Sequence, residues 1–409
     1  MTDRAWQRVQ LGDHCTKIGS GSTPRGGESV YQESGVSLIR SQNVYNGQFA
    51  VAGLAYLDDE HADQLKGVTV ESGDVLLNIT GDSVARSCRV PDDVLPARVN
   101  QHVAIIRPKS AELDSRFVGY FFISPFMQDT MLSLAGSGGT RKALTKEMIE
   151  RFEVPRPPRP VQERIADILA AYDDLIENNR RRMALMEDAA RQVYREWFVR
   201  LRFPGHEHTH ITNGVPSGWD AHILDDLCLI GRGASPRPIA AFMGGEIPWF
   251  RIADATASES AFIFRTQEHV TDDGAKKSIL LQPDSLILSN SATCGIPYFT
   301  AVAGCVHDGW LHFSQFKRVS QQLLFCFLWF KREELVSSVG DGSTQKNLNT
   351  EAVGRLKLAL PRSDALLTQF NEAVAPMFSM ILNLATQNQQ LRAARDLLLP
   401  RLMSGQVVV

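Results

Sequence analysis

The order of short motifs in the first part of the chain recurs in the second part, and this internal repeat constrains the fold more than any other feature. Residues 6–25 match residues 219–237, since each segment opens on Trp and closes on Pro-Arg. Later, GSGGTRKAL (136–144) matches GDGSTQKNL (340–348). The separation between matching residues changes along the middle and stays fixed at the end. This indicates two homologous halves whose loops differ in length.

Each half is followed by a segment whose apolar positions alternate spacings of four and three residues, the pattern of a coiled-coil seam. The pattern lasts for about 33 residues, which predicts helices roughly 50 Å long at 1.5 Å per residue. The first seam contains Ile165, Leu169, Ile176, Asn179, Met183, Met186 and Val193, and the second contains Phe370, Val374, Ile381, Leu384, Asn388, Leu391 and Leu398.

The two seams are most simply explained if the helices pair with each other. A duplicated unit of globular half plus helix closes under a pseudo-twofold axis, and this makes the pair antiparallel. Asn179 and Asn388 lie on the seams, where a polar residue commonly fixes the register of a coiled coil. The alternative is two unrelated helices, each packed on its own half.

The globular halves combine strand and helix patterns. The segments 36–41, 74–80 and 102–108 are short and rich in branched aliphatic residues, which is typical of strands. The runs 117–132 and 321–339 each have the length and periodicity of a helix. The sequence therefore predicts an α+β fold in which two homologous mixed α/β domains are separated by a long antiparallel two-helix coiled coil.

The boundaries follow from composition and from the repeat. The segment VPRPPRPVQ (154–162) is rich in proline and ends the first half, because proline continues neither a helix nor an inner strand. The predicted domains are residues 1–155 and 204–360, each followed by a helical segment, 156–203 and 361–409 respectively.

Composition excludes several classes of protein. Hydrophobic residues make up 44% and charged residues 22% of the chain, which is ordinary for a globular protein. The start shows no secretory signal pattern, and the longest apolar run is too short to span a bilayer. The six cysteines form no CxxC pair, which favours a reducing compartment. We expect a cytoplasmic protein without a membrane partner.

The motifs of common enzymes are missing. The sequence contains no GxxxxGK[ST] phosphate loop, no GxGxxG after a strand and no HExxH. It also lacks the acidic-x-Lys pair of metal nucleases and the NPP[YF] or DPP[YF] motif of base methylation. The stretch HEHTH (206–210) could bind a metal, but its position after Pro-Gly favours a solvated linker. His102 and His307 fall at matching places in the two halves, and we interpret them as polar loop or strand residues.

Over essentially its full length the chain resembles the specificity subunits of type I restriction–modification systems. The duplicated order and the two heptad helices carry this resemblance together. The matching motifs are the opening Trp6 to Asp13, GSTP (21–24), LIRS (38–41), WFVRLRFPGH (197–206), VPSGW (215–219) and GDGSTQKNL (340–348).

The resemblance implies a non-catalytic, DNA-binding protein with two target-recognition domains. Each domain would read one half of a split double-stranded DNA sequence. The helices would separate the domains and bind methyltransferase subunits, two per chain. The assembly would methylate adenine with S-adenosylmethionine, and added restriction subunits would translocate and cleave foreign DNA with ATP and Mg. This chain itself would bind no metal and no cofactor.

Arginines beside Gly-, Ser- and Thr-containing loops are the candidate DNA contacts, because a guanidinium can bind guanine O6/N7 or a phosphate in bidentate fashion, while Thr and Gln can contact adenine or the backbone. The candidates are Arg25, Arg40, Arg86, Thr140, Arg141 and Lys142 in the first half, and Arg237, Arg251, Thr344, Gln345 and Lys346 in the second. For each of them the alternative is an ordinary solvated surface residue.

Charge alone does not single out a DNA-binding half. Residues 1–155 carry 16 cations and 19 anions, and residues 204–360 carry 13 and 16. Local clusters, or the surfaces of partner subunits, would then supply the phosphate contacts. Two other hypotheses remain open: a scaffold whose duplicated domains bind protein, and a self-sufficient restriction–methylation enzyme, for which the chain lacks the motor, methylase and nuclease domains.

Overall fold

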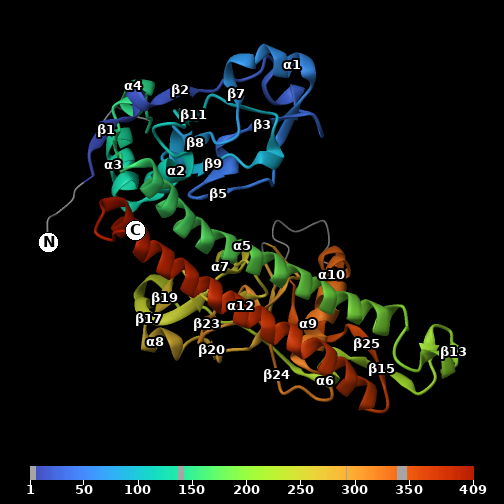
Figure 1. The fold of residues 1–409 in the computed structure, drawn as a ribbon. Helices are drawn as coiled ribbons and strands as arrows, with labels where there is room; N and C mark the ends of the chain where they lie inside the picture. Colours follow the sequence, from blue (N-terminus) through green and yellow to red (C-terminus); the bar gives the residue numbers. More distant parts are fainter. Residues whose placement is uncertain (1–5, 137–141, 292, 339–347) are drawn as a thin grey trace. The chain divides into compact units, whose positions relative to one another are not determined.

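The computed structural model describes residues 6–136, 142–291, 293–338 and 348–409 (Figure 1). The contacts of the chain divide it into two compact units, residues 1–174 with 391–409, and residues 175–390. Each unit therefore contains one globular half together with part of both long helices. In the described part of the chain, no helix has the length and apolar character needed to cross a membrane.

Two four-stranded sheets form the centre of the described part of the first globular half. One has the strand order β6 (Ala55–Leu57), β3 (Val36–Ile39), β10 (Ala97–Val99), β7 (Thr69–Val70), and its strands β3 and β10 are parallel. The other has the order β2 (Cys15–Ser20), β11 (Val103–Pro108), β8 (Val75–Asn78), β9 (Ser87–Arg89), and all its neighbours are antiparallel.

Strands β8 and β11 are covered on both faces, which explains their unbroken apolar runs. Leu77 and Ile106 lie in the core formed with helices α2 (Ser115–Ile123) and α3 (Pro125–Gly136). Their neighbours Leu76 and Ile105 point the opposite way, into the core formed with β3, β7 and β10. All four of these side chains are fully buried. The second sheet is thus packed between the helices and the first sheet.

The second globular half repeats this topology strand by strand. Its counterpart of the first sheet has the order β19 (His269–Val270), β17 (Met243–Phe250), β23 (Gly304–Val306), β20 (Ile279–Leu281), again with one parallel pair, β17 and β23. Its other sheet has the order β16 (Leu229–Arg232), β24 (Trp310–Ser314), β21 (Leu286–Ser289), β22 (Pro297–Thr300), and β18 (Phe262–Ile263) is added at the edge. The predicted duplication of a mixed α and β half is confirmed.

Each half is also closed in the same way. The strand that opens the half pairs antiparallel with the strand that precedes the long helix. These pairs are β1 (Arg8–Gln10) with β12 (Glu153–Pro155), and β15 (Trp219–Ile223) with β25 (Lys357–Pro361).

The two runs that were each predicted as a single helix are divided. The first is split at Ser124, whose ψ of 145° is extended because it precedes Pro125. The second consists of α9 (Gln321–Phe330) and α10 (Arg332–Ser338), with Lys331 between them. Glu333 and Glu334 lie in the first turn of α10, where acidic side chains favour the start of a helix.

The shorter elements lie in the connections. They are α1 (Asp59–Gln64), α4 (Lys146–Glu150), α6 (Leu224–Leu227), α7 (Ile252–Thr256), α8 (Asp272–Ala275), α11 (Thr350–Gly354) and the hairpins β4 (Val44–Tyr45) with β5 (Gln48–Phe49) and β13 (Ile211–Thr212) with β14 (Val215–Pro216).

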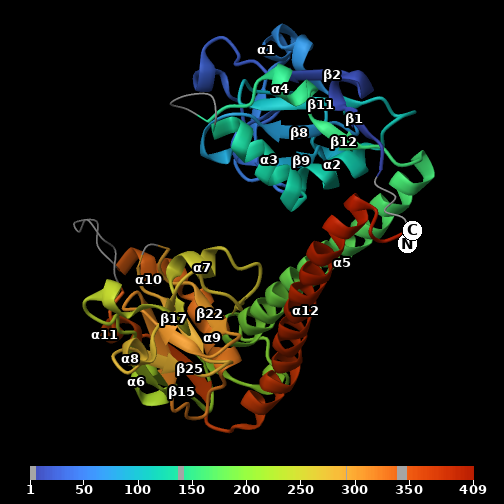
Figure 2. The same ribbon diagram turned by 90° about the vertical axis from the view of Figure 1, so that its left-hand side faces the viewer.

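The two long helices are α5 (Arg159–Tyr194, 36 residues) and α12 (Ala365–Ser404, 40 residues). A π-helical turn, Arg195–Val199, follows α5. The helices lie side by side in both ribbon views (Figures 1 and 2). In the second unit, Asn179 Nδ2 donates to Asn388 Oδ1 (2.9 Å), and in the first unit Arg395 pairs with Asp173 (2.5 Å). Lower residue numbers in α5 therefore face higher ones in α12, so the predicted antiparallel pair is confirmed.

Most residues of the predicted seams are buried. In the first unit, Ile165 and Leu169 of α5 share a core with the end of α12, and Leu398 is packed against that core. In the second unit, Met183 of α5 and Phe370, Val374, Ile381 and Leu384 of α12 belong to one core, against which Met186 and Val193 are packed. Ile176, Asn179 and Asn388 are also buried, and Leu391 is partly exposed.

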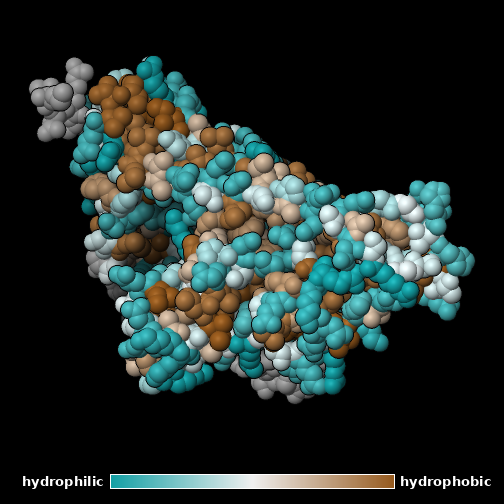
Figure 3. Space-filling model, turned by 90° about the horizontal axis from the view of Figure 1, so that it is seen from below, coloured by the Kyte–Doolittle hydropathy of each residue, from teal (hydrophilic) through white to brown (hydrophobic). Residues whose placement is uncertain are grey.

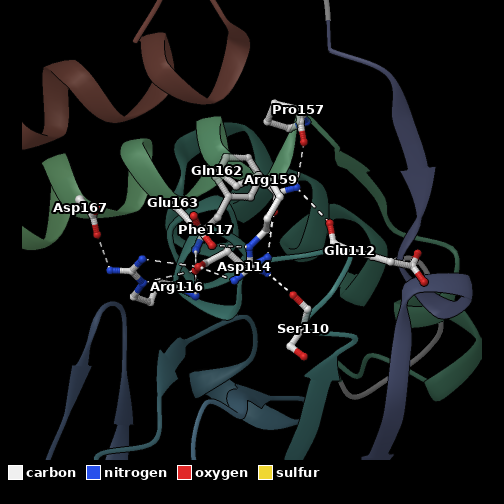
Figure 4. Close-up of polar contacts among 10 residues, drawn as sticks. All are labelled: Ser110, Glu112, Asp114, Arg116, Phe117, Pro157, Arg159, Gln162, Glu163 and Asp167. Atoms are coloured by element: carbon white, nitrogen blue, oxygen red, sulfur yellow. Dashed lines mark hydrogen bonds and ion pairs between the residues drawn. The ribbon is translucent and has the colours of Figure 1, made fainter.

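The start of α5 is fixed to the first globular half by a buried amide. Gln162 has no exposed surface. Its side chain accepts from the backbone N–H of Asp114 (2.8 Å) and donates to the carbonyls of Glu112 (3.1 Å) and Pro157 (2.9 Å). Arg159 adds an ion pair with Asp114 at 3.1 Å (Figure 4). The buried polar groups of two loops are thus satisfied by one side chain.

We expect Gln162→Ala to lower the free energy of unfolding by about 1–3 kcal/mol, because it leaves one buried N–H and two buried carbonyls without their partner. Gln162→Leu, which introduces the residue found at the repeat-equivalent Leu367, should not restore this loss. Thermal unfolding of the purified chain measures both effects. The control is Asp167→Asn, which removes a more exposed ion pair with Arg116 and should change stability little. Equal stability of Gln162→Leu and the native chain would contradict the role assigned to this amide.

We expect Asn179→Leu to destabilise the helix pair by about 1–3 kcal/mol, since the buried Oδ1 of Asn388 loses its hydrogen-bond donor. Asn388 is 2% exposed, so water cannot replace that partner. The double variant Asn179→Leu, Asn388→Leu should recover the stability, because both polar groups are then removed. Thermal unfolding of the two single variants and the double variant tests this. Additive losses in the double variant would show that the two amides do not act as a pair.

Candidate nucleic-acid interface

In the first half, the loop after β2 lies against the turn between β10 and β11. The backbone N–H of Gly21 donates to Val103 O (2.9 Å), and that of Ser22 donates to Val99 O (3.1 Å). A Cβ atom at Gly21 would lie 2.0 Å from Val99 O, so glycine is required at this close approach. The GSTP loop is therefore seated by its backbone, which leaves its side chains for other contacts.

Polar side chains connect this loop to the loop after β8. The Thr23 hydroxyl donates to Gln101 Oε1, and the Gln101 amide nitrogen lies 3.0 Å from His102 Nε2. The other ring nitrogen of His102 lies 2.7 Å from the Thr80 hydroxyl. Gly81 N–H donates to Lys142 O (3.2 Å). Four segments that are distant in sequence thus meet at one end of the sheets.

The second half brings the equivalent segments together. Gly233 N–H donates to Trp310 O (2.9 Å), and Ala234 N–H donates to Val306 O (3.0 Å). A Cβ at Gly233 would lie 2.1 Å from His307 O, so glycine is required here as well.

Side-chain contacts in the second half also follow the first. The Ser235 hydroxyl donates to Asp308 Oδ1 (2.6 Å), and Asn290 Nδ2 donates to Asp308 O (3.1 Å). Leu348 N–H donates to Asn290 O (2.8 Å), as Leu144 N–H does to Ile79 O (2.9 Å).

These backbone contacts correct one prediction from the sequence. The backbone N–H of Ser22 donates to Val99, and that of Ala234 donates to Val306, so Val99 and Val306 are equivalent. The residues after Val99 therefore match those after Val306 one by one. His307 corresponds to Asn100, and Asp308 corresponds to Gln101. The prediction that His102 and His307 match is wrong, because Gly309 occupies the position in the second turn that His102 occupies in the first.

Two predicted arginines lie in the seated loops. Arg25 is exposed, two residues after Thr23. The side chain of Arg237 is 70% exposed, and its Nη2 lies 3.8 Å from Asp308 Oδ2. Neither guanidinium is held in a buried ion pair.

Arg40 and Arg251 occupy matching positions at the ends of β3 and β17. The backbone N–H of Arg40 donates to Asn43 Oδ1 (3.0 Å), and that of Arg251 donates to Asp254 Oδ2 (2.8 Å). Their guanidinium groups already have partners in the same half. Arg40 Nη2 donates to Gly53 O (2.7 Å), and Arg251 pairs with Glu268.

The remaining candidates are less connected to this cluster. Arg86 lies over the ring of Tyr45, 4.8 Å from its centre, and Lys142 is exposed. The predicted Thr140, Arg141, Thr344, Gln345 and Lys346 lie outside the described residues.

Prediction from the sequence missed the residues that tie the loops together, namely Thr23, Thr80, Gln101, Ser235 and Asp308. The repeat itself contains a signal for two of them, since Thr23 and Ser235 stand at the same place before Pro-Arg. Gln101 and Asp308 differ in type, so only the backbone contacts reveal their equivalence.

The electrostatics of the second cluster combine a carboxylate with arginines. The Ser235 hydroxyl holds the pKa of Asp308 below its usual value, so this side chain is an anion at neutral pH. Burial lowers the pKa of His307, so it is neutral there. Among the described residues, no group of three or more His, Cys, Asp or Glu side chains could hold a metal ion. Chemically, this set of groups can donate and accept hydrogen bonds at a polar, partly charged surface.

Comparison with known proteins finds specificity subunits of type I restriction enzymes among the proteins similar to this chain. The model of the type I restriction modification DNA specificity domain matches residues 3–187. The MjaIX specificity subunit of a type I restriction enzyme from Methanocaldococcus jannaschii is 27% identical over 77% of this chain and 74% of its own length. The HindI specificity subunit from Haemophilus influenzae is 22% identical over 98% of this chain and 99% of its own length.

A solved structure has the same fold. The crystal structure of the type I restriction–modification S subunit from M. genitalium aligns with 98% of this chain and 97% of its own, with a TM-score of 0.60 and 13% identity. Sequence, family model and fold all indicate a specificity subunit of a type I restriction–modification system.

Proposed function

We propose that each globular half of this chain reads one part of a split DNA target, and that the chain itself catalyses no step. The observation that supports this most directly is the duplication of the seated loops. The same backbone contacts hold the loop 21–25 in one half and the loop 233–237 in the other. Two equivalent loop clusters with different side chains suit the reading of two different short sequences.

The side chains of these loops are of the kinds that contact base edges. Arginine bonds guanine, glutamine bonds adenine and aspartate bonds cytosine in the major groove. Both halves carry more acidic than basic residues, so part of the phosphate contact would come from partner subunits. S-adenosylmethionine, ATP and Mg would be bound by those partners.

The long helices have exposed apolar positions suited to docking methyltransferase subunits. Figure 3 shows hydrophobic and hydrophilic residues interspersed over most of the face that it draws. We therefore consider the exposed apolar side chains of the helices one by one as docking positions. Leu175 of α5 is 50% exposed, and Met380, its repeat equivalent on α12, is 40% exposed. One such site on each helix would suit two methyltransferase subunits per chain.

The basic run of α5 would contribute unequally to this docking. Arg180 is 3.7 Å from Glu259 of the same unit. The side chain of Arg181 is 75% exposed, and Arg182 is also exposed. The latter two residues are therefore the better candidates for contact with a partner subunit.

We expect Arg25→Ala to weaken recognition of one half of the methylated sequence and Arg237→Ala to weaken recognition of the other. The reason is that each guanidinium belongs to a different loop cluster. The full chain is produced with its modification subunits, and methylated adenines are mapped across the host genome. Binding of the complex to the target duplex is measured at several salt concentrations, because a variant that has lost a phosphate contact rather than a base contact shows a salt slope reduced by about 1.

The control for these variants is Arg355→Ala, which removes a cation that is 74% exposed and paired with Glu351. It should leave the methylated sequence unchanged. A variant that alters both half-sites together would contradict separate reading. A complex without any salt-dependent footprint on DNA would favour the scaffold hypothesis instead.

We further expect that lengthening both long helices by one heptad will lengthen the uncontacted gap in the target. One heptad adds about 10 Å to a helix, equivalent to about three base pairs. Because Asn179 faces Asn388, the two insertions belong beside these residues, which keeps the rest of the seam in register. Genome-wide mapping of methylated adenines shows the gap. An active variant with an unchanged gap would show that the helices do not set the spacing.

A further inference from the structure

The two halves share one arrangement at their loops but differ in its chemistry. In each half, the residue that precedes Pro-Arg has a side-chain hydroxyl. This hydroxyl donates to the second residue of the turn against which the loop lies. In the first half Thr23 bonds the amide of Gln101, and in the second Ser235 bonds the carboxylate of Asp308 (2.6 Å). The backbone around both pairs is held by equivalent hydrogen bonds. The accepting residue therefore occupies the same position in both halves, but it carries an amide in one half and a carboxylate in the other.

An arginine accompanies each of these side chains. Arg25 and Arg237 stand two residues after Thr23 and Ser235 respectively. In the second half the guanidinium lies 3.8 Å from the Asp308 carboxylate, and both groups are well exposed, at 70% and 49%. An exposed pair of this kind contributes little to stability. Both groups can therefore exchange their mutual contact for contacts with a ligand.

The carboxylate narrows the choice of ligand groups. DNA phosphates repel an anion, and the hydroxyl of Ser235 favours the charged form of Asp308. A carboxylate in this loop needs a hydrogen-bond donor, and the cytosine amino group in the major groove is the donor that aspartate contacts. The guanine paired with that cytosine presents O6 and N7, which a neighbouring arginine can bind in bidentate fashion. An arginine and an aspartate side by side are thus complementary to one G·C pair.

We propose that residues 25 with 101, and 237 with 308, form a repeated pair of specificity-determining positions. Arg237 and Asp308 read a G·C pair in the second half-site, and Gln101, whose partner Thr23 precedes Arg25 by two residues, reads an adenine in the first. This inference rests on the proposed function, because it assigns the bases that the loop clusters contact. Gln101 is exposed, and its amide can both accept from adenine N6 and donate to N7.

The test uses Asp308→Asn in the full chain, produced with its modification subunits. The amide keeps an oxygen to accept from Ser235 but replaces the other carboxylate oxygen with a donor. We expect the requirement for cytosine at one position of the second half-site to be lost or to shift towards adenine, with discrimination falling about tenfold to a hundredfold. The first half-site should stay the same. Mapping of methylated adenines reads both half-sites at once.

Two controls separate base reading from a structural role. Ser235→Ala removes the hydroxyl that holds Asp308 but keeps the carboxylate, so it should weaken DNA binding without changing the preferred base. Asp273→Asn removes a carboxylate that is 76% exposed and paired with Lys276, and it should change nothing. If Asp308 only positions the loop, the isosteric Asp308→Asn will keep the native sequence preference.

The outcomes distinguish this inference from the proposed function. If the native complex does not recognise a split sequence, the proposed function fails. If the native complex does so and Asp308→Asn methylates the same sequence, the assigned reading pair is overturned. If Asp308→Asn abolishes methylation, the affinity of the variant complex is measured for a series of duplexes, in each of which one base pair of the second half-site is exchanged. An unchanged ranking of these duplexes also overturns the inference, and a loss of preference at one G·C pair supports it.

Discussion

The hydrogen bond between Asn179 and Asn388 determines which residues of α5 face which residues of α12. Both amides are buried in the seam, and Asn388 also donates to Ile176 O (3.1 Å). A shift of one heptad would separate the two amides, at a cost of about 1–3 kcal/mol for each buried group left unsatisfied. The apolar seam supplies most of the stabilisation, but it repeats every seven residues and tolerates such a shift. The amide pair does not, and every contact between the helices depends on the register that it selects.

The pair of long helices also shows how far the sequence could predict the fold. The heptad spacing, the duplicated motifs and the apolar runs were sufficient for the two halves, three of the strands and the antiparallel helices, because each is a periodic signal. The breaks at Ser124 and Lys331 were missed, since hydrophobic periodicity continues across them. The buried amide of Gln162 was missed as well. Its repeat equivalent is the apolar Leu367, so the need for a polar side chain arises only from the loops folded around it.

The candidate interface could be predicted only in part, for a physical reason. Arg25 and Arg237 could be predicted as candidate DNA contacts because glycine, serine and proline mark their loops. Thr23 with Gln101, and Ser235 with Asp308, are pairs separated by more than 70 residues, brought together by strands that pair across the sheet. No spacing in the sequence encodes such a contact. The equivalence of the two turns lies in their backbone hydrogen bonds, since the residue types at the turns have diverged.

That divergence follows from the way in which the loops are held. Gly21 and Gly233 bring the loop backbones within hydrogen-bond distance of the turns, so the position of each loop does not depend on the side chains beside it. A substitution at the turn, such as an amide for a carboxylate, then changes the groups presented without moving the scaffold. In loops that are held by their backbone, the side chains that would contact a target can change without a large change in the stability of the fold. The two halves can consequently keep one fold while Gln101 and Asp308 present different chemistry at the same place.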